Sequence, residues 1–145
     1  MNIIRTNQTQ ATHTFLYKNL MKNTMAPASS LKIWFIIHFI VDYIFGIPLL
    51  LAPQWTLTLF GFQATELLTP RLVGAALLGI GGISLIARNE SKEVYRSLLL
   101  LKIIWSISAI IAIVLTLTEE APASAWVILT IFIFFSGLWC YYWNK

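Results

Sequence analysis

Four long apolar stretches follow a polar leader and are separated by short polar connections. An α-helix rises about 1.5 Å per residue, so about 20 residues cross the ~30 Å hydrocarbon core of a bilayer. Each apolar stretch is long enough for one crossing. The pattern therefore predicts an all-α fold, a polytopic membrane protein built as a four-transmembrane-helix bundle with short loops. The expected helices cover residues 31–51, 69–87, 97–118 and 123–143.

The connections and helix ends carry further signals. Trp55 and Leu59 recur at helical spacing, which predicts a short interfacial helix, and Gly61 suits its end. Thr69 is placed to cap the second long helix, and residues 88–96 form a mixed-charge loop. Aromatic side chains near both ends of the fourth helix predict anchors at the membrane interfaces. They are Trp126, Trp139, Tyr141, Tyr142 and Trp143.

Composition favours the same class of protein. The chain is 58% hydrophobic and only 11% charged, whereas soluble domains carry about a quarter charged residues. The net charge of +4 comes from basic residues that flank the apolar stretches, so we expect membrane lipids as partners and no nucleic acid. The single cysteine, Cys140, excludes a disulfide within one chain.

Residues 1–30 form a polar leader without acidic residues. We interpret it as a disordered tail that precedes a membrane domain at residues 31–145. Two alternatives stay open. One is an organelle-targeting segment, because such segments are basic, hydroxyl-rich and poor in acids. The other is an over-long start, with translation beginning at Met21 or Met25.

The Lys and Arg residues predict an orientation. If the chain crosses four times, only Arg71 falls on one side. Because cytoplasmic loops carry an excess of Lys and Arg, both termini are expected on the cytoplasmic side of a plasma or organelle membrane. The residues on that side are Arg5, Lys18, Lys22, Lys32, Arg88, Lys92, Arg96, Lys102 and Lys145.

Asp42 is the strongest candidate for a functional residue. It lies near the middle of the first helix, where an acid costs several kcal/mol unless it is paired, neutral or hydrated. His38 lies one turn earlier on the same face, and Lys102 is expected at a similar depth in the third helix. The three residues predict a ligand or proton site. The alternatives are a hydrogen-bonded core acid at Asp42 and, as the favoured interpretation, a Lys102 side chain that reaches the headgroups.

Arg71 is the second candidate, since it lies at the outer end of the second helix, on the side opposite to the other Lys and Arg residues. It is placed to pair with Glu66, to bind a lipid phosphate, or to reach a polar cavity near Asp42.

Small residues on the second helix predict a close helix–helix contact. Ala75, Gly79 and Gly82 lie on one stripe, with Gly74 and Gly81 beside it. Such residues let membrane helices approach until their backbones touch.

Several chemistries are disfavoured. Two histidines, His13 and His38, leave no transmembrane pair for haem, and no cluster has metal-ligand spacing. No convincing catalytic set is present, so we expect no enzyme, metal or cofactor. A membrane enzyme with His38 and Asp42 as its acid–base pair is a minor alternative.

Three segments resemble a known family. They are DYIFGIPLLLAP (42–53), LFGF (59–62) and PRLVGAALLGIGGISLIAR (70–88). Together they look like the DoxX-like group of small four-helix membrane proteins, which are largely uncharacterised. The resemblance implies a four-helix bundle without a settled activity, and it carries over no cofactor-binding residue.

Two functions fit these observations. The first is a non-enzymatic membrane module, either an accessory or assembly subunit of other membrane proteins or a binder of a lipid- or quinone-like ligand. The second is a dimeric, proton-coupled transporter of small solutes that uses Asp42.

Overall fold

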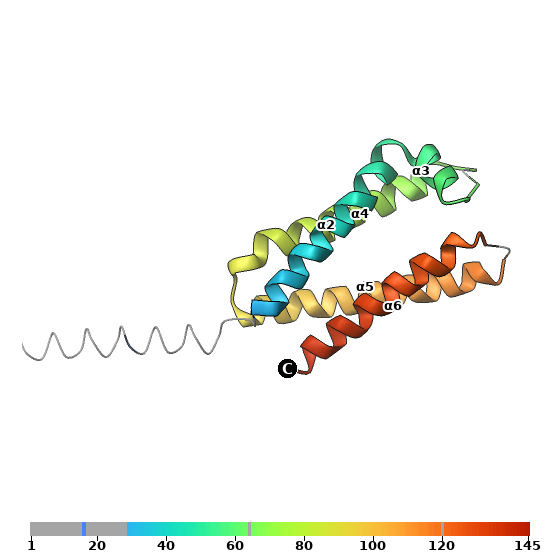
Figure 1. Ribbon diagram of the computed structural model, residues 1–145. Coiled ribbons are helices and arrows are strands. Elements are labelled where there is room, and N and C mark those ends of the chain that lie inside the picture. The colour runs from blue at the N-terminus through green and yellow to red at the C-terminus, as the bar shows by residue number, and fades with distance from the viewer. Residues whose placement is uncertain (1–15, 17–28, 64, 120) are drawn as a thin grey trace, which may run out of the picture.

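The computed structural model describes Leu16 and residues 29–63, 65–119 and 121–145, so the predictions for residues 1–28 lie outside the described residues, Leu16 apart. Its helical elements follow one another with short connections (Figure 1). They are α2 (Ser29–Leu51), α3 (Pro53–Leu59), α4 (Leu68–Ile86), the 3₁₀ turn η1 (Ala87–Asn89), α5 (Lys92–Leu117) and α6 (Ser124–Trp143).

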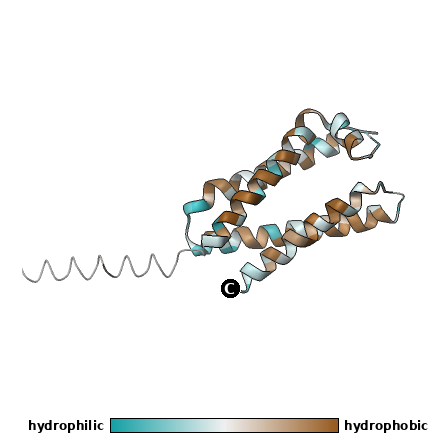
Figure 2. Cartoon of the chain, in the orientation of Figure 1, coloured by the Kyte–Doolittle hydropathy of each residue, from teal (hydrophilic) through white to brown (hydrophobic). Residues whose placement is uncertain are grey.

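The all-α fold is confirmed. The described residues contain no strand, and four helices are long and apolar enough to cross a membrane. Figure 2 shows hydrophobic residues along all four. The short helix predicted around Trp55 is α3, and Gly61 follows it with a positive φ of 77°, a conformation that glycine adopts without a Cβ clash.

The helices form two hairpins. Helix α2 packs along α4, with α3 between them in sequence, and α5 packs along α6. The hairpins lie close together at the end where α2 begins and diverge toward α3 and the α5–α6 connection (Figure 1).

The α2–α4 contact brings backbone against backbone. A Cβ atom on Gly74 would lie 2.8 Å from the carbonyl oxygen of Gly46 and 2.8 Å from the backbone nitrogen of Leu50. Only glycine fits at that distance, so the two helices gain close dispersion contact along their length.

The predicted packing stripe was therefore only partly right. Ala75 and Gly79 are exposed, and a Cβ on Gly79 would meet nothing within 4 Å. Gly82 is half-buried beside the Tyr43 hydroxyl. The buried face of α4 runs one position away, at Pro70, Gly74, Leu77, Gly81 and Ser84. Helix α4 carries two neighbouring stripes of small residues, and periodicity alone does not tell which one meets a partner.

The loop predicted at residues 88–96 is mostly helical. It contains the end of η1 and the first turns of α5, which begins at Lys92. Tyr95 explains the early start: its ring is buried against Phe35, with centroids 4.7 Å apart, and its hydroxyl donates a hydrogen bond of 3.0 Å to the Arg88 carbonyl. The charged residues around it lie on the exposed face of the same turns.

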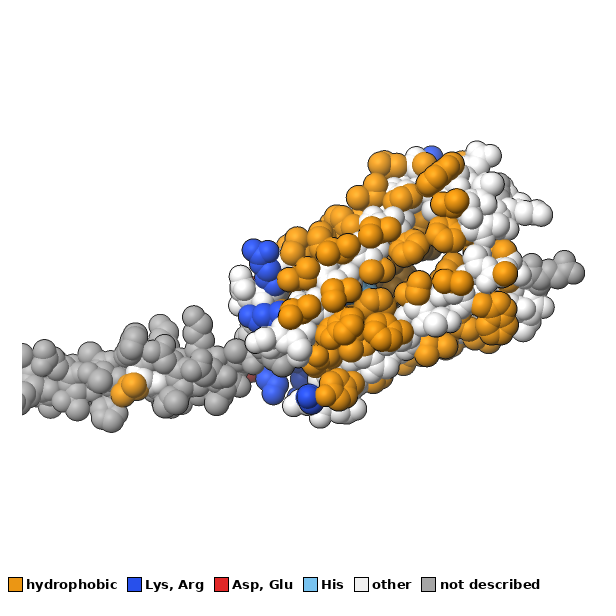
Figure 3. Space-filling view, viewed as in Figure 1, with side chains coloured by type: hydrophobic (Ala, Val, Ile, Leu, Met, Phe, Trp, Pro, Cys, Tyr) orange, Lys and Arg blue, Asp and Glu red, His pale blue; other side chains and the backbone are white. Residues whose placement is uncertain are grey.

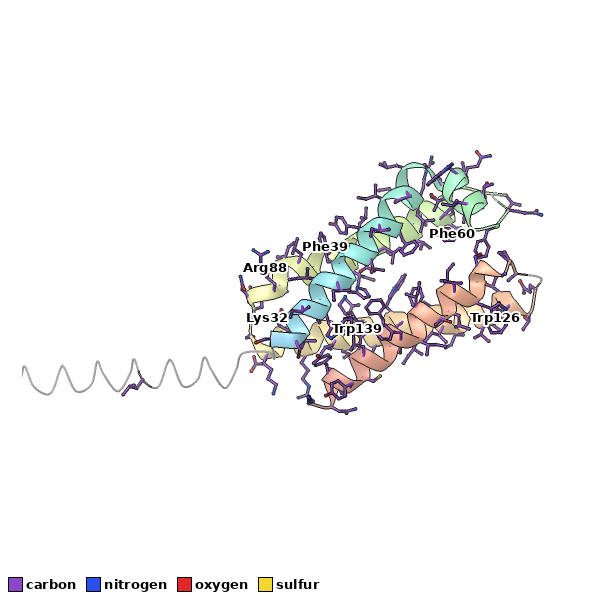
Figure 4. All side chains as sticks on the ribbon, in the orientation of Figure 1. Lys32, Phe39, Phe60, Arg88, Trp126 and Trp139 are labelled. Carbon is purple, nitrogen blue, oxygen red and sulfur yellow. The ribbon has the colours of Figure 1, made fainter. Side chains whose placement is uncertain are left out.

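The hairpins are joined at both ends. A buried apolar cluster joins α2, α5 and α6 where the hairpins meet, and it contains Leu31, Phe35, Tyr95, Leu99, Phe135 and Trp139. At the other end the Ser124 hydroxyl donates a hydrogen bond to the Phe60 carbonyl. Figure 4 labels residues at both ends, with Lys32 and Arg88 at the first and Phe60 and Trp126 at the second.

Candidate functional site

The candidate site is a buried polar cluster that both hairpins build. Helix α2 buries one narrow stripe, and His38 and Asp42 stand on it one turn apart. The Nδ1 atom of His38 lies 2.7 Å from Asp42 Oδ2 and 3.0 Å from Lys102 Nζ, which comes from α5. The structure thus brings together the three residues that spacing and depth had placed near one another.

All three side chains are shielded from solvent. Lys102 is 2% exposed, Asp42 4% and His38 8%. The favoured interpretation of Lys102, in which its amine reaches the headgroups, was therefore wrong. Its Nζ atom points inward and lies 5.2 Å from the ring centroids of both Phe35 and Trp139, a distance at which a cation is attracted to an aromatic face.

Aromatic rings from α6 enclose the cluster. The His38 ring makes edge contacts with Phe135, at 4.8 Å between centroids, and with Trp139, at 5.2 Å. Figure 4 labels Trp139 on the side of α6 that faces α2. Trp139 is fully buried, so its predicted role as an interfacial anchor was wrong. Its position four residues after Phe135 on the same helix face was the signal in the sequence that linked the two rings.

Glycine on α4 makes room for the acid. A Cβ on Gly81 would lie 2.7 Å from the Cβ of Asp42 and 3.1 Å from its Oδ2. The position of Asp42 in the polar cluster thus depends on the α2–α4 contact, because the two helices can approach this closely only where residue 81 has no side chain.

The hydrogen bonds at His38 cannot all form at once. Nδ1 has one position in the ring plane, which holds either a proton or a lone pair. With a lone pair it accepts from Lys102; with a proton it donates to Asp42. In this structure Asp42 Oδ2 lies 2.7 Å from Nδ1 but has no hydrogen-bond partner among the described residues. The cluster is therefore one hydrogen bond short in either arrangement.

A cavity of about 550 Å³ lies against the cluster, between the two hairpins. His38, Asp42 and Lys102 line it, and Ser106 stands beside them on α5. The rest of the wall is mainly apolar and aromatic, with Phe45, Leu77, Trp105, Ile131, Phe132 and Phe135 among its residues. Thr65, Glu66 and Thr69 add polar groups from the connection before α4 and from its first turn. Figure 3 shows a hollow between the hairpins, flanked by hydrophobic side chains.

Arg71 does not join this site. Its side chain is exposed and lines a separate hollow with Gln54 and Trp55. Its expected partner Glu66 instead accepts hydrogen bonds from the backbone N–H groups of Leu68, at 2.8 Å, and Thr69, at 2.9 Å. The N-cap residue of α4 is Leu67, and the Glu66 carboxylate accepts from the N–H groups at the helix start, so the prediction of Thr69 as the cap was wrong.

The fold and the site together define a class. Four apolar helices of spanning length, with ionisable side chains turned inward, make this chain an integral membrane protein of the polytopic α-helical kind. In the part of the chain that the structure describes, no group of three His, Cys, Asp or Glu is placed to hold a metal ion.

Comparison of the chain with protein-family models, with curated proteins and with solved structures finds no match.

Proposed function

We propose that this protein is a non-enzymatic membrane module that binds an amphipathic, membrane-soluble small molecule of lipid- or quinone-like character between its two hairpins. The observation that supports the proposal is the position of Lys102, His38 and Asp42, which are buried and yet line an apolar cavity of about 550 Å³. Small-molecule sites are typically of this kind, mostly apolar with a few polar groups that fix orientation.

The energetic cost of the cluster favours a function over a purely structural role. A Lys or Asp at the centre of a membrane helix costs roughly 2.5–3.5 kcal/mol each on insertion scales. Well-packed apolar residues would hold the hairpins together at least as well as a buried polar cluster. Polar groups that carry such a cost and line a cavity are best explained by a molecule that binds to them.

The proposal predicts that filling the cavity expels the ligand. Ile131 lines the cavity from α6, while Ile133 on the same helix is exposed on the outer surface. Protein purified in mild detergent should carry a bound amphiphile that native mass spectrometry detects. Ile131→Trp should lose it, and the matched control Ile133→Trp should keep it. Equal occupancy in both variants, or an empty parent protein, would contradict the proposal.

A proton-coupled transporter, acting as a dimer, is the second candidate. It is favoured by the presence of Asp42, an acid, on the cavity wall beside an imidazole. The two functions differ in whether the bound molecule crosses the membrane. If the protein supports proton-driven uptake into proteoliposomes and the Asp42→Asn variant does not, the transporter hypothesis replaces the binding-module hypothesis.

Three further assignments belong to the proposal. Membership of the DoxX-like group rests on the segments at residues 42–53, 59–62 and 70–88. A role as an accessory or assembly subunit, with other membrane proteins or a second copy as partner, agrees with the short connections. A cytoplasmic location of both termini agrees with the Lys and Arg side chains at the end where α2 begins (Figure 3).

A further inference from the structure

Lys102 is a buried cation without a direct counter-ion. Among the described residues, the carboxylate that pairs in the cluster is Asp42, and it contacts His38 rather than Lys102. The Lys102 amine makes one hydrogen bond among the described residues, to the His38 ring nitrogen, and lies against the faces of Phe35 and Trp139. An ammonium group has three N–H donors, so Lys102, which lines the cavity, keeps donors that a ligand can use.

The ionisable groups that face His38 are few. From α2 it meets Asp42, and from α5 it meets Lys102. Helix α6 presents the rings of Phe135 and Trp139, which do not titrate, and α4 presents Gly81 beside Asp42. With His38 neutral, the ammonium and the carboxylate bring the net charge of the cluster to zero.

We propose that the cavity takes a single-chain amphiphile with an anionic head group, that the head group binds Lys102, and that its binding is coupled to the uptake of one proton at His38 Nδ1. The inference rests on the proposed function and assigns a ligand class to the same site. An apolar cavity of about 550 Å³ suits one hydrocarbon chain, and the cation on its wall sets the charge of the head group.

The coupling follows from the shared nitrogen. In the empty protein, Lys102 donates to Nδ1, and Asp42 Oδ2 faces a nitrogen that has no proton to give. An anionic head group accepts hydrogen bonds from the free donors of Lys102 and adds one negative charge to the cluster. That charge favours the uptake of a proton from the aqueous phase at Nδ1, which then gives up the hydrogen bond from Lys102 and faces Asp42 Oδ2, 2.7 Å away, as a donor.

The charges balance before and after. The empty cluster holds one cation and one anion. The occupied cluster holds Lys102 and His38 as cations, with Asp42 and the head group as anions. A buried site of low dielectric favours both neutral states over a site with an uncompensated negative charge. Without the proton, the bound anion would leave that charge behind.

The test uses the protein in phosphatidylcholine nanodiscs with two probes. Hexadecanesulfonate stays ionised at every pH used, so any pH dependence of its affinity comes from the protein, and hexadecanol is the neutral control. One coupled proton predicts that the sulfonate Kd rises about tenfold per pH unit on the alkaline limb. The hexadecanol Kd should not change with pH.

Variants test the role of Lys102 in anion binding separately from the role of Asp42 in the charge balance. Lys102→Met should weaken sulfonate binding about tenfold or more and leave hexadecanol binding intact, which also shows that the variant is folded. Lys92→Met, exposed on the same helix, is the matched control and should behave as the parent. Asp42→Asn leaves Lys102 uncompensated, so at pH values at which Lys102 stays protonated it should bind the sulfonate without pH dependence and more tightly than the parent.

Two results would overturn the inference: a sulfonate Kd that does not change with pH in the parent protein, or equal sulfonate binding by Lys102→Met and Lys92→Met. In either case hexadecanol binding to the parent would leave the proposed function standing. Failure of the parent to bind either probe would instead contradict the proposed function itself.

Discussion

At the scale of single residues, Gly81 has the sharpest structural requirement. A Cβ there would lie 2.7 Å from the Cβ of Asp42, closer than real carbon atoms approach. Gly81→Ala should therefore push α2 from α4, displace Asp42, and lower the free energy of unfolding by about 1–3 kcal/mol, the usual cost of overpacking. Reversible unfolding in mixed micelles, followed by Trp fluorescence, measures the loss.

Gly79→Ala is the matched control on the same helix. Its new methyl group meets nothing within 4 Å, and Ala favours a helix over Gly by up to about 1 kcal/mol, so this variant should be no less stable than the parent. Equal destabilisation by the two substitutions would show that the space beside Asp42 does not decide the result.

The residues of the site were predictable to different degrees. The spacing of His38 and Asp42 places both on one helix face, and the depth of Lys102 in its own apolar stretch places it beside them. The direction of the Lys102 side chain was not predictable, because it depends on Phe35, which lies 67 residues earlier in the sequence, and on Trp139 from α6, which lies 37 residues later. A long amine with four rotatable bonds reaches either way from one backbone position.

At the scale of secondary-structure elements, the start of α4 has a pH-dependent stability. Hydrogen bonds from the Thr69 side chain and from the backbone N–H groups of Thr69 and Leu68 lower the pKa of the Glu66 carboxyl below its ordinary value. A carboxyl whose pKa is lower in the folded state stabilises the fold above its ordinary pKa. That contribution disappears as the pH falls through the lowered pKa.

Glu66→Gln should therefore be slightly less stable than the parent at neutral pH and equal to it in acid. Thermal unfolding in detergent, followed by circular dichroism at both pH values, gives the comparison. Glu90→Gln, an exposed substitution in the α4–α5 connection, should follow the parent at both. An unchanged difference between Glu66→Gln and the parent in acid would rule out the carboxylate as the source of the effect.

The predicted helix boundary was wrong where a tertiary contact determines where the helix begins. The apolar stretch of the third helix begins near residue 97, yet α5 starts at Lys92 because Tyr95 packs on Phe35 and bonds to the Arg88 carbonyl. A charged turn is helical when one aromatic side chain in it reaches the core. No local pattern distinguishes that turn from a loop, since the partner ring lies 60 residues earlier.

At the scale of the whole molecule, the number of long helices followed directly from the apolar stretches, because the bilayer sets the length that one crossing needs. The pairing of α2 with α4 and of α5 with α6 did not. Short connections allow neighbouring helices to pack, but the placement of one hairpin relative to the other, and hence the cavity, depends on contacts distant in sequence. These are the aromatic packing where the hairpins meet and the Ser124–Phe60 contact at the far end.

The charge distribution makes a final prediction about orientation. In a background with Cys140→Ser, single cysteines at Glu90 and Asn144 mark the end rich in Lys and Arg, and one at Gln63 marks the opposite end; all three positions are exposed. Because the excess of Lys and Arg stays on the cytoplasmic side, a membrane-impermeant maleimide added to intact cells should label Gln63→Cys alone. Permeabilised cells should show labelling of all three. Labelling of Asn144→Cys in intact cells, with Gln63→Cys protected, would show that the protein has the opposite orientation. Labelling of both would show an odd number of crossings and would contradict the four-helix arrangement.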